Sequence, residues 1–192
     1  MGMSHVSFSL SMSLDGFVAG PNDEIDPLHD WLFNGDHESR FGHGLRMSEA
    51  SRAALDAELA GHGACVVGRN TFEAAGRWGG KPPFDFPYFV VTHEPPTEHR
   101  GEFTYITEGV EAAIEQARAA ADGKDVNLMG ADIPQQAIRA GLLDELVIHL
   151  IPVLLDDGKR LFDRLGGRVD LERTQVGEAP EGVTHLRFRV IR

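Results

Sequence analysis

The sequence predicts an α/β domain in which helices flank a single mixed, mostly parallel sheet that ends in a C-terminal antiparallel hairpin. Between Ala64 and Ala140, short apolar runs alternate with helix-like segments, which is typical of parallel strands joined by helical crossovers. Two further runs, Val169–Val176 and Val183–Ile191, fit a hairpin with a longer loop. The length of 192 residues and the 42% hydrophobic content suit one domain over residues 1–192.

The N-terminal third predicts a strand, a long connection and a helix. His5–Leu14 alternates apolar and small polar residues, as in a strand with one buried face. Gly20–Gly44 is rich in Gly, Pro, Asp, Asn and His, and connections of that length are usually functional or mobile. Ser48–Leu59 predicts a helix with Ser48 or Ser51 as its N-cap.

The rest of the chain predicts strands and helices in alternation before the hairpin. The strands are Ala64–Val67, Tyr88–Thr92, Phe103–Ile106 and Val126–Met129. The helices are Thr71–Ala75, Val110–Ala121 and Ile133–Ala140. After them, Leu146–Leu155 predicts a long strand with Pro152 at a bulge or an edge position, and Leu161–Leu165 predicts a short helical turn.

Charge and composition exclude several classes of protein. The chain carries 30 acidic and 18 basic side chains, a net charge of -12, which repels nucleic acid and anionic membrane surfaces. No apolar stretch is long enough to cross a bilayer and no secretory signal is recognised, so a cytoplasmic protein is expected. Cys65, the single cysteine, sits in an apolar run that favours a buried residue over a nucleophile. The nine histidines show no metal-ligand spacing, and no metal site is predicted.

Candidate ligand-binding residues follow the predicted strands, because ligands of such sheets lie beyond the carboxyl ends of the strands. These positions are Asp15 and Gly16, then Gly68, Arg69, Asn70 and Thr71, then Thr92 and His93, and finally Gly130, Ala131, Asp132 and Ile133.

Two of these turns lead from a glycine into a helix N-terminus, which offers free N–H donors and a positive dipole to a phosphate. Glycine lets the backbone approach a ligand closely, and the guanidinium of Arg69 pairs well with a phosphate. The alternative is that Gly68 only makes a turn, Asn70 caps the helix and Arg69 is solvated. No Walker loop or dinucleotide fingerprint is present, so the spacing alone names no nucleotide.

Several segments resemble known reductases. VVGRNTFEAAGRW resembles the Gly-Arg-x-Thr-Trp segment of dihydrofolate reductase, FVVTH resembles the strand of that fold that grips the 2′-phosphate of NADPH, and NLMGADIPQQAI resembles its glycine turn under the pyrophosphate. The closer resemblance is to the reductase domain of riboflavin biosynthesis, the C-terminal domain of bifunctional deaminase-reductases. It is carried by SMSLDGFVAG, PPFDFPYFVVTHEPP and AGLLDELVIHLIPVLLDDGKRLF.

This resemblance implies a dihydrofolate-reductase-like fold, NADPH as hydride donor, a small-molecule substrate and a homodimer. Carried over by position, Gly68, Arg69, Asn70 and Thr71 would hold the pyrophosphate and the 2′-phosphate, Thr92 and His93 would lie at the 2′-phosphate, and Gly130, Ala131, Asp132 and Ile133 would lie under the pyrophosphate. Asp15 and Gly16 would border the nicotinamide and the substrate.

The sequence departs from the family pattern in three places. Met129 stands where the family has the first glycine of a pair, and Asp156 changes the loop after the long strand. The helix carboxylate with which dihydrofolate reductase binds the pterin would fall near Ser51 and Arg52, so folate is not the expected substrate.

The resulting hypothesis is an NADPH-dependent reductase that transfers hydride to a C=N or C=O of a small heterocyclic or sugar-like substrate. It would resemble 5-amino-6-(5-phosphoribosylamino)uracil reductase and dihydrofolate reductase. Asp15 is the candidate catalytic residue, expected to contact the substrate and to orient a water that supplies the proton, although an Asp-Gly pair also commonly forms only a turn. The alternative is a noncatalytic nucleotide-binding or dimerisation module that has kept the fold, which Met129 and Asp156 favour. The apolar strand Leu146–Leu155 is expected near the dimer interface.

Overall fold

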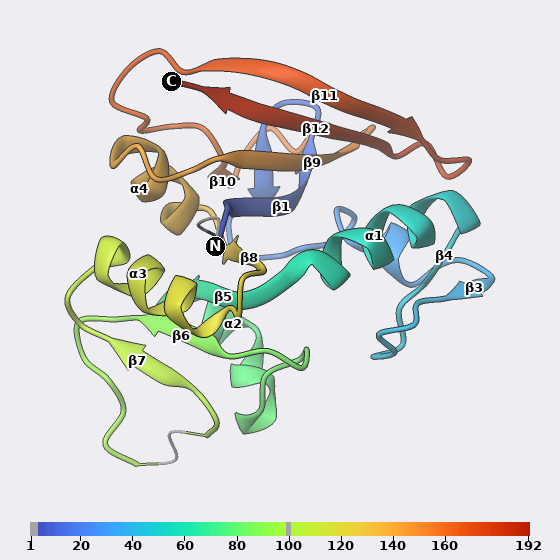
Figure 1. The fold of residues 1–192 in the computed structure, drawn as a ribbon. Helices are drawn as coiled ribbons and strands as arrows, with labels where there is room; N and C mark the ends of the chain where they lie inside the picture. The colour runs from blue at the N-terminus through green and yellow to red at the C-terminus, as the bar shows by residue number, and fades with distance from the viewer. Residues whose placement is uncertain (1–3, 99–100) are drawn as a thin grey trace. The chain divides into compact units, whose positions relative to one another are not determined.

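The computed structural model describes residues 4–98 and 101–192 and contains strands, α-helices and two short 3₁₀ helices (Figure 1). The strands are β1 (Val6–Ser13), β2 (Phe17–Ala19), β3 (His37–Glu38), β4 (Arg46–Met47), β5 (His62–Gly68), β6 (Tyr88–Val91), β7 (Thr104–Ile106), β8 (Asp125–Met129), β9 (Glu145–Ile151), β10 (Lys159–Arg160), β11 (Asp170–Glu178) and β12 (Thr184–Ile191). The α-helices are α1 (Glu49–Gly61), α2 (Arg69–Ala74), α3 (Val110–Ala120) and α4 (Asp132–Arg139), and the 3₁₀ helices are Asp30–Leu32 and Gly76–Gly80.

Eight of the strands form one sheet in the order β11-β12-β9-β1-β8-β5-β6-β7. The pairs β1–β8, β8–β5, β5–β6 and β6–β7 are parallel, whereas β12 runs antiparallel to both β9 and β11. This topology confirms the predicted mixed, mostly parallel sheet with a C-terminal antiparallel hairpin. Each parallel connection carries a helix or a long crossover, as parallel pairing requires.

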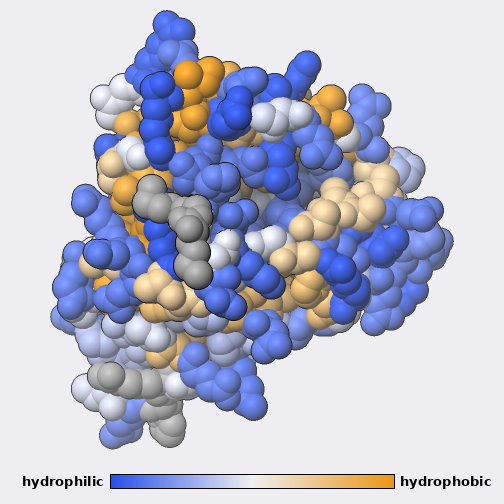
Figure 2. Space-filling view, viewed as in Figure 1, coloured by the Kyte–Doolittle hydropathy of each residue, from blue (hydrophilic) through white to orange (hydrophobic). Residues whose placement is uncertain are grey.

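The contacts of the chain divide it into two compact units, which are described separately. Unit 1 comprises Met1–Phe8 and His62–Asp144, and unit 2 comprises Ser9–Gly61 and Glu145–Arg192. Strand β1 contributes its first residues to unit 1 and its later residues to unit 2. The prediction of a single domain stays a prediction. None of the described helices is long and apolar enough to cross a membrane, and hydrophilic residues cover most of the face seen in Figure 2.

Unit 1 is built around buried parallel strands. The central residues of β5, β6 and β8 are almost all buried, which explains their continuous apolar runs. Helices α3 and α4 contact each other and both β5 and β8. Cys65 is fully buried in β5, and burial raises the pKa of its thiol, in keeping with a core residue. Phe72 and Trp78 belong to an aromatic cluster beside it, with ring centroids 5.8 Å apart.

Unit 2 contains β9, β12, β11, the later part of β1, and α1. Helix α1 begins at Glu49, and the Ser48 hydroxyl accepts a hydrogen bond from the Ser51 N–H at 3.2 Å, so Ser48 is the N-cap. Strand β9 is buried along most of its length, whereas β11 is the edge strand and is exposed at eight of its nine residues. On this hairpin, Arg189 of β12 forms an ion pair with Glu172 of β11.

Two sequence-based predictions in unit 2 were wrong. The strand predicted over Leu146–Leu155 ends at Ile151, because Pro152 has no N–H to continue the ladder and the chain turns there, with the Val153 N–H bonded to the Ile151 carbonyl at 2.8 Å. The helical turn predicted over Leu161–Leu165 is absent. The Leu161 N–H instead donates to the Gly16 carbonyl at 3.0 Å, and the fully buried Leu161 side chain anchors an irregular segment.

The core of unit 2 contains hydrogen-bonded polar side chains. His149 of β9 and His185 of β12 lie side by side, with their Nδ1 atoms 2.8 Å apart. The Nε2 atom of His149 lies 2.8 Å from the Ser9 hydroxyl of β1, and Glu58 of α1 lies 3.9 Å from the same nitrogen. Trp31 packs on both imidazoles, at centroid distances of 4.8 and 5.4 Å. Because these groups are removed from water, each depends on its neighbours for hydrogen bonds.

Burial shifts the ionisation of this cluster toward uncharged forms. It raises the pKa of Glu58 to about 7 and lowers the pKa of His149 to about 3. Glu58 therefore contributes stability that is complete below its unfolded pKa of 4.5 and is lost as the pH rises toward 7. His149 contributes stability that is present above 6.5 and is lost as the pH falls toward 3.

The Glu58→Gln variant tests this assignment. The substituted amide keeps the shape of the side chain and its capacity to hydrogen-bond to Ser9, but it never has to be ionised in the core. As the pH rises from acid to mildly alkaline, the original chain should therefore lose about 3 kcal/mol of unfolding free energy that the variant keeps. Urea unfolding of both chains at pH values below 4.5 and above 7 measures this difference. Parallel pH profiles for the two chains would contradict it.

Candidate functional site

Two glycine turns of unit 1 come into contact at the carboxyl ends of their strands. Gly130 follows β8 with a φ of +92°, and a Cβ added to it would lie 2.4 Å from the Thr71 hydroxyl oxygen. A Cβ added to Gly68, at the end of β5, would lie 3.3 Å from the Ile133 side chain. The structure thus brings together Gly68, Thr71, Gly130 and Ile133, as the sequence predicted for one ligand site. Both the conformation and the space at residue 130 require glycine.

Neither helix that starts at these turns has a side-chain cap. Gly68 is the N-cap of α2 and Ala131 the N-cap of α4, and neither helix N-terminus receives a hydrogen bond from its cap side chain. The proposed cap Asn70 lies inside α2, where it is exposed, so the alternative in which Asn70 caps the helix is wrong. Uncapped helix N-termini present N–H donors that suit a phosphate.

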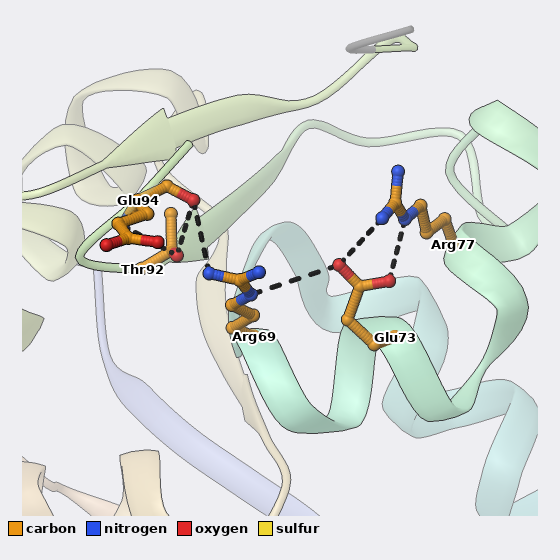
Figure 3. Close-up of polar contacts among 5 residues, drawn as sticks. All are labelled: Arg69, Glu73, Arg77, Thr92 and Glu94. Atoms are coloured by element: carbon orange, nitrogen blue, oxygen red, sulfur yellow. Dashed lines mark hydrogen bonds and ion pairs between the residues drawn. The ribbon is translucent and has the colours of Figure 1, made fainter. Parts of the chain in front are cut away.

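Arg69 and Thr92 meet at one backbone carbonyl (Figure 3). The Arg69 guanidinium donates to the Glu94 carbonyl at 3.3 Å, and the Thr92 hydroxyl donates to the same oxygen at 3.2 Å. The Glu94 N–H in turn donates to the Thr92 hydroxyl oxygen at 3.3 Å. This arrangement joins the turn after β5 to the end of β6, and His93 lies exposed between Thr92 and Glu94.

The anion nearest Arg69 is already shared with a second arginine. Glu73 lies one helical turn further along α2, with its carboxylate 3.9 Å from the Arg69 Nε. The same carboxylate accepts two hydrogen bonds from Arg77, at 2.7 and 3.0 Å, as Figure 3 shows. The Arg69 side chain is 49% exposed, and so loose and exposed a pair contributes little stability. A bound phosphate could therefore replace Glu73 as the partner of Arg69 at small cost.

The remaining predicted cofactor residues lie at the start of α4. Asp132 is exposed, and its carboxylate accepts a hydrogen bond from Gln136 at 2.5 Å. Met129, which replaces a glycine of the family pattern, packs its side chain against the apolar cluster around Cys65 and Phe72. The methionine side chain is therefore accommodated within unit 1, and the positive φ of the turn falls on Gly130.

The residues of unit 1 fit a phosphate-bearing dinucleotide. The glycine positions leave no room for a Cβ at residue 130, the two helix N-termini lack caps, and an exposed guanidinium stands beside a backbone carbonyl and a threonine. Together these groups supply N–H donors, close backbone approach and one positive charge, which is the chemistry that a pyrophosphate and a further phosphate need.

In unit 2, Asp15 organises a turn. Its carboxylate accepts hydrogen bonds from the Ser13 hydroxyl at 2.6 Å, from the Asp156 N–H at 2.8 Å and from the Leu155 N–H at 3.1 Å. These bonds, led by that of Ser13, lower the pKa of Asp15 to about 2. Asp15 is therefore an anion at neutral pH and holds no proton to donate. Its role in catalysis stays a prediction, and in such a role Asp15 would act in its ionised form.

The structure also explains why Asp156 is tolerated in the loop where the sequence departs from the family pattern. Asp156 adopts a φ of +68°, a conformation that aspartate tolerates better than most residues, and its N–H bonds to Asp15. Gly16, the neighbour of Asp15, has a φ of +92°, and the Asp15 carbonyl accepts a hydrogen bond from Arg160 at 3.1 Å. The Asp15-Gly16 turn and the Asp156 loop are thus parts of one hydrogen-bonded structure.

Unit 2 also contains a pocket of about 1040 Å³ that the sequence did not indicate. Its lining includes Trp31, Ser48, Glu49, Ile151 and Glu181. Of these, Ser48 carried a signal in the sequence, but as a helix N-cap and not as part of a pocket. The others come from segments far apart in the chain, and no pattern in the sequence joins them.

Replacing Gly130 tests the close packing of the two glycine turns. Gly130→Ala forces a Cβ against the Thr71 hydroxyl and places alanine at an unfavourable φ, so it should destabilise the fold by roughly 1–3 kcal/mol. Thr71→Ala in the same chain removes the clashing oxygen and should restore part of this loss, but not the part due to φ. Urea unfolding of the two single variants and the double variant measures the coupling. Strictly additive effects would show that the two turns do not touch.

Comparisons with known proteins agree with this geometry. A protein from Shewanella sp. PV-4 described as a candidate riboflavin biosynthesis protein has the same fold, with a TM-score of 0.74 and 21% identity over 99% of this chain and 100% of that one. Dihydrofolate reductase from Enterococcus faecalis, solved with NADP(H) and a ligand named RAB-propyl, gives a TM-score of 0.62 and 14% identity, over 98% of this chain and 97% of that one.

The deaminase and 5-amino-6-(5-phosphoribosylamino)uracil reductase of Thermotoga maritima matches with a TM-score of 0.65 and 11% identity, over 98% of this chain but 57% of that one. No curated protein matches the chain. These likenesses show the fold and confirm it as dihydrofolate-reductase-like. The model of the RibD C-terminal domain matches residues 4–185, nearly the whole chain. The chain therefore belongs to the RibD C-terminal domain family.

Proposed function

We propose that this protein is an NADPH-dependent reductase that transfers hydride to a C=N or C=O bond of a small heterocyclic or sugar-like compound. The observation that carries the proposal is the meeting of two uncapped helix N-termini at Gly68 and Gly130, with Arg69 beside them. Membership of the RibD C-terminal domain family supports a reductase, and the NADP(H) complex of the Enterococcus faecalis enzyme supports the cofactor.

In this proposal the chain binds and orients the cofactor, which supplies the hydride when it is bound. The backbone at Gly68 and Gly130 and the first N–H groups of α2 and α4 hold the pyrophosphate. Arg69, Thr92 and His93 hold the 2′-phosphate, with Arg69 exchanging Glu73 for that phosphate.

The two residues that favoured a noncatalytic module, Met129 and Asp156, both have structural explanations that leave the proposed cofactor site intact. Met129 packs into the apolar cluster of unit 1 and leaves the Gly130 turn intact. Asp156 serves a turn by donating its N–H to Asp15. Neither residue blocks the proposed cofactor site, so the reductase hypothesis is preferred. The homodimer stays a prediction, and most of the residues of β9 on which it rested are buried within unit 2.

The Arg69→Ala variant tests whether Arg69 binds the 2′-phosphate or the pyrophosphate of the cofactor. If Arg69 binds the 2′-phosphate, which NADH lacks, the variant should lose roughly 1.5–3 kcal/mol of NADPH affinity, or about ten- to a hundredfold, and retain its NADH affinity. Titration of nicotinamide fluorescence with each cofactor measures both affinities. Glu73→Ala is the matched control, since it frees Arg69 of its carboxylate partner and should strengthen NADPH binding slightly.

Two other results would change the assignment. Equal weakening of both cofactors by Arg69→Ala would place the side chain at the pyrophosphate. No effect on either cofactor, in a variant that remains folded, would remove Arg69 from the site and with it the strongest support for NADPH.

Dihydrofolate should be a poor substrate. Helix α1 offers no carboxylate at Ser51 or Arg52, and the carboxylate of Asp56 is already bonded to the Ser39 hydroxyl at 2.5 Å and to Arg52 at 3.2 Å. Loss of one charge-assisted contact to the pterin costs roughly 2–3 kcal/mol, or about a hundredfold in kcat/KM. Steady-state assays of NADPH oxidation with dihydrofolate measure this directly. A kcat/KM in the ordinary range of enzymes for their own substrates would contradict it.

A further inference from the structure

A chain of hydrogen bonds in unit 2 leads inward from the wall of the pocket. At the pocket, the Glu181 carboxylate accepts hydrogen bonds from the Ser51 hydroxyl and, at 3.0 Å, from the Ser48 hydroxyl. The Ser51 oxygen lies 3.0 Å from His185 Nε2, and His185 Nδ1 lies 2.8 Å from His149 Nδ1. Ser51 and both histidines are buried, so these contacts are shielded from exchange with water.

The inner end of the chain is a carboxyl group. His149 Nε2 lies 2.8 Å from the hydroxyl of the partly buried Ser9, and the Ser9 side chain opposes the larger effect of burial on the pKa of the Glu58 carboxyl. Glu58 is buried, with a side-chain exposure of 7%, and its carboxylate also lies 3.9 Å from His149 Nε2. Consecutive hydrogen bonds therefore connect a carboxylate at a pocket to Ser9, and the Glu58 carboxyl lies beside this inner end of the chain.

The direction of every bond in the chain follows from the charge of Glu181. An ionised Glu181 can only accept, so the Ser51 hydroxyl donates to it and the Ser51 oxygen accepts from His185 Nε2–H. His185 is then the Nε2–H tautomer, and its Nδ1 accepts from His149 Nδ1–H. His149 Nε2 accepts the Ser9 proton, and the Ser9 oxygen accepts from a protonated Glu58. All the donors point from the core toward the pocket.

We propose that Glu181 exchanges a proton with a ligand bound in this pocket, and that the Ser51, His185, His149 and Ser9 side chains carry that proton between Glu181 and Glu58. The proposal rests on the proposed function in one respect, which is the use of the proton. Hydride transfer to a C=N or C=O bond leaves a nitrogen or oxygen anion that takes up one proton.

The transfer is a concerted shift in which each proton of the chain moves across one hydrogen bond. Glu181 takes the Ser51 proton, Ser51 takes the Nε2 proton of His185, and His185 Nδ1 takes the Nδ1 proton of His149. His149 Nε2 then takes the Ser9 proton, and Ser9 takes the proton of Glu58. One O–H bond breaks at Glu58 and one forms at Glu181, which passes the proton to the ligand. Each histidine stays neutral and exchanges its tautomer.

The surroundings favour neutral histidines and one mobile proton. Burial lowers the pKa of both His149 and His185, and it raises the pKa of Glu58 to about 7. Although burial opposes it, the hydrogen bonds of Ser51 and Ser48 keep the pKa of Glu181 below its usual range. Among the described residues, His29, Arg187 and Glu145 also act on the titratable groups of the chain, and Arg187 pairs with Glu145 at 2.7 Å.

The pocket lining indicates the charge of the ligand. Among the described residues that line it are the carboxylates of Asp30, Asp36, Glu49 and Glu181, and none of these residues is a lysine or an arginine. Such a lining repels a phosphorylated compound and admits an uncharged or cationic one. Trp31, which is 6% exposed, lies at the wall of the pocket and packs its ring against both histidines.

The tautomers of the two histidines provide the test. In the full chain labelled with ¹⁵N, at a pH below the pKa of Glu58, the ring spectra should show His149 as Nδ1–H and His185 as Nε2–H. As the pH rises through that pKa, both rings should exchange tautomers together, and neither should become an imidazolium. Once Glu58 has lost its proton, Ser9 can donate to that carboxylate, which reverses the bonds from Ser9 to Ser51, while the Ser48 hydroxyl still donates to Glu181.

Three variants locate the ends of the chain. Glu58→Gln donates to Ser9 at every pH and should abolish the exchange of tautomers. If that variant does not fold, Ser9→Ala removes the same link and should have the same effect. Glu181→Gln closes the outer end and should slow the solvent exchange of both ring N–H protons about a hundredfold, the order of effect of a positioned proton-transfer group. Glu49→Gln is the matched control, because Glu49 lines the same pocket outside the chain.

Three results would overturn the proposal. They are unchanged tautomers across the titration of the original chain, an imidazolium at either histidine, or equal ring exchange rates in Glu181→Gln and Glu49→Gln. The titration uses neither NADPH nor a substrate. A failed titration would therefore remove the proton path without touching cofactor binding, and absence of NADPH binding would leave the proton path standing.

Discussion

The need of buried polar groups for hydrogen bonds shapes both units of this protein, with the side-chain oxygen of Asn127 in β8 an exception among the described residues. In unit 1 the central strands are buried and apolar, so polar groups gather where the strands end and backbone donors become free. In unit 2 the same requirement is met inside the core, where serine, histidine and glutamate side chains satisfy one another. The proposed cofactor site and the proposed proton path are thus two outcomes of one physical rule.

The parts of the fold that depend on local pattern could be predicted from the sequence. Continuous apolar runs such as Ala64–Val67 identified buried parallel strands, and Ser48 identified the start of α1. The wrong predictions arose where tertiary contacts override local pattern. Pro152 ends a strand whose apolar run continues beyond it, and Leu161 lies in an irregular segment with its N–H bonded to the Gly16 carbonyl.

Some residues of the candidate sites could likewise be predicted from local sequence pattern, and others depend on tertiary contacts. Gly68, Arg69 and Gly130 carry local signals, a glycine or a cation at the end of a strand, and the structure brings their turns together in unit 1. Glu181 and Glu58 carried no such signal, since their roles depend on partners that lie on β1, α1, β9 and β12. The role of Asp15 also could not be predicted from the sequence, because the residues that donate to its carboxylate, Leu155 and Asp156, lie far from it in the sequence.

The exposed edge strand β11 has a consequence for the behaviour of the protein at high concentration. The open edge of a sheet is a template on which another extended chain can add, and this route leads to fibrils. Here the edge carries charged side chains at Glu172 and Arg173, and the register of the hairpin shifts between Arg173 and Gln175. A chain that adds to this edge would have to desolvate the charges and follow the irregular register. The hairpin therefore protects the sheet against self-association into β-rich aggregates.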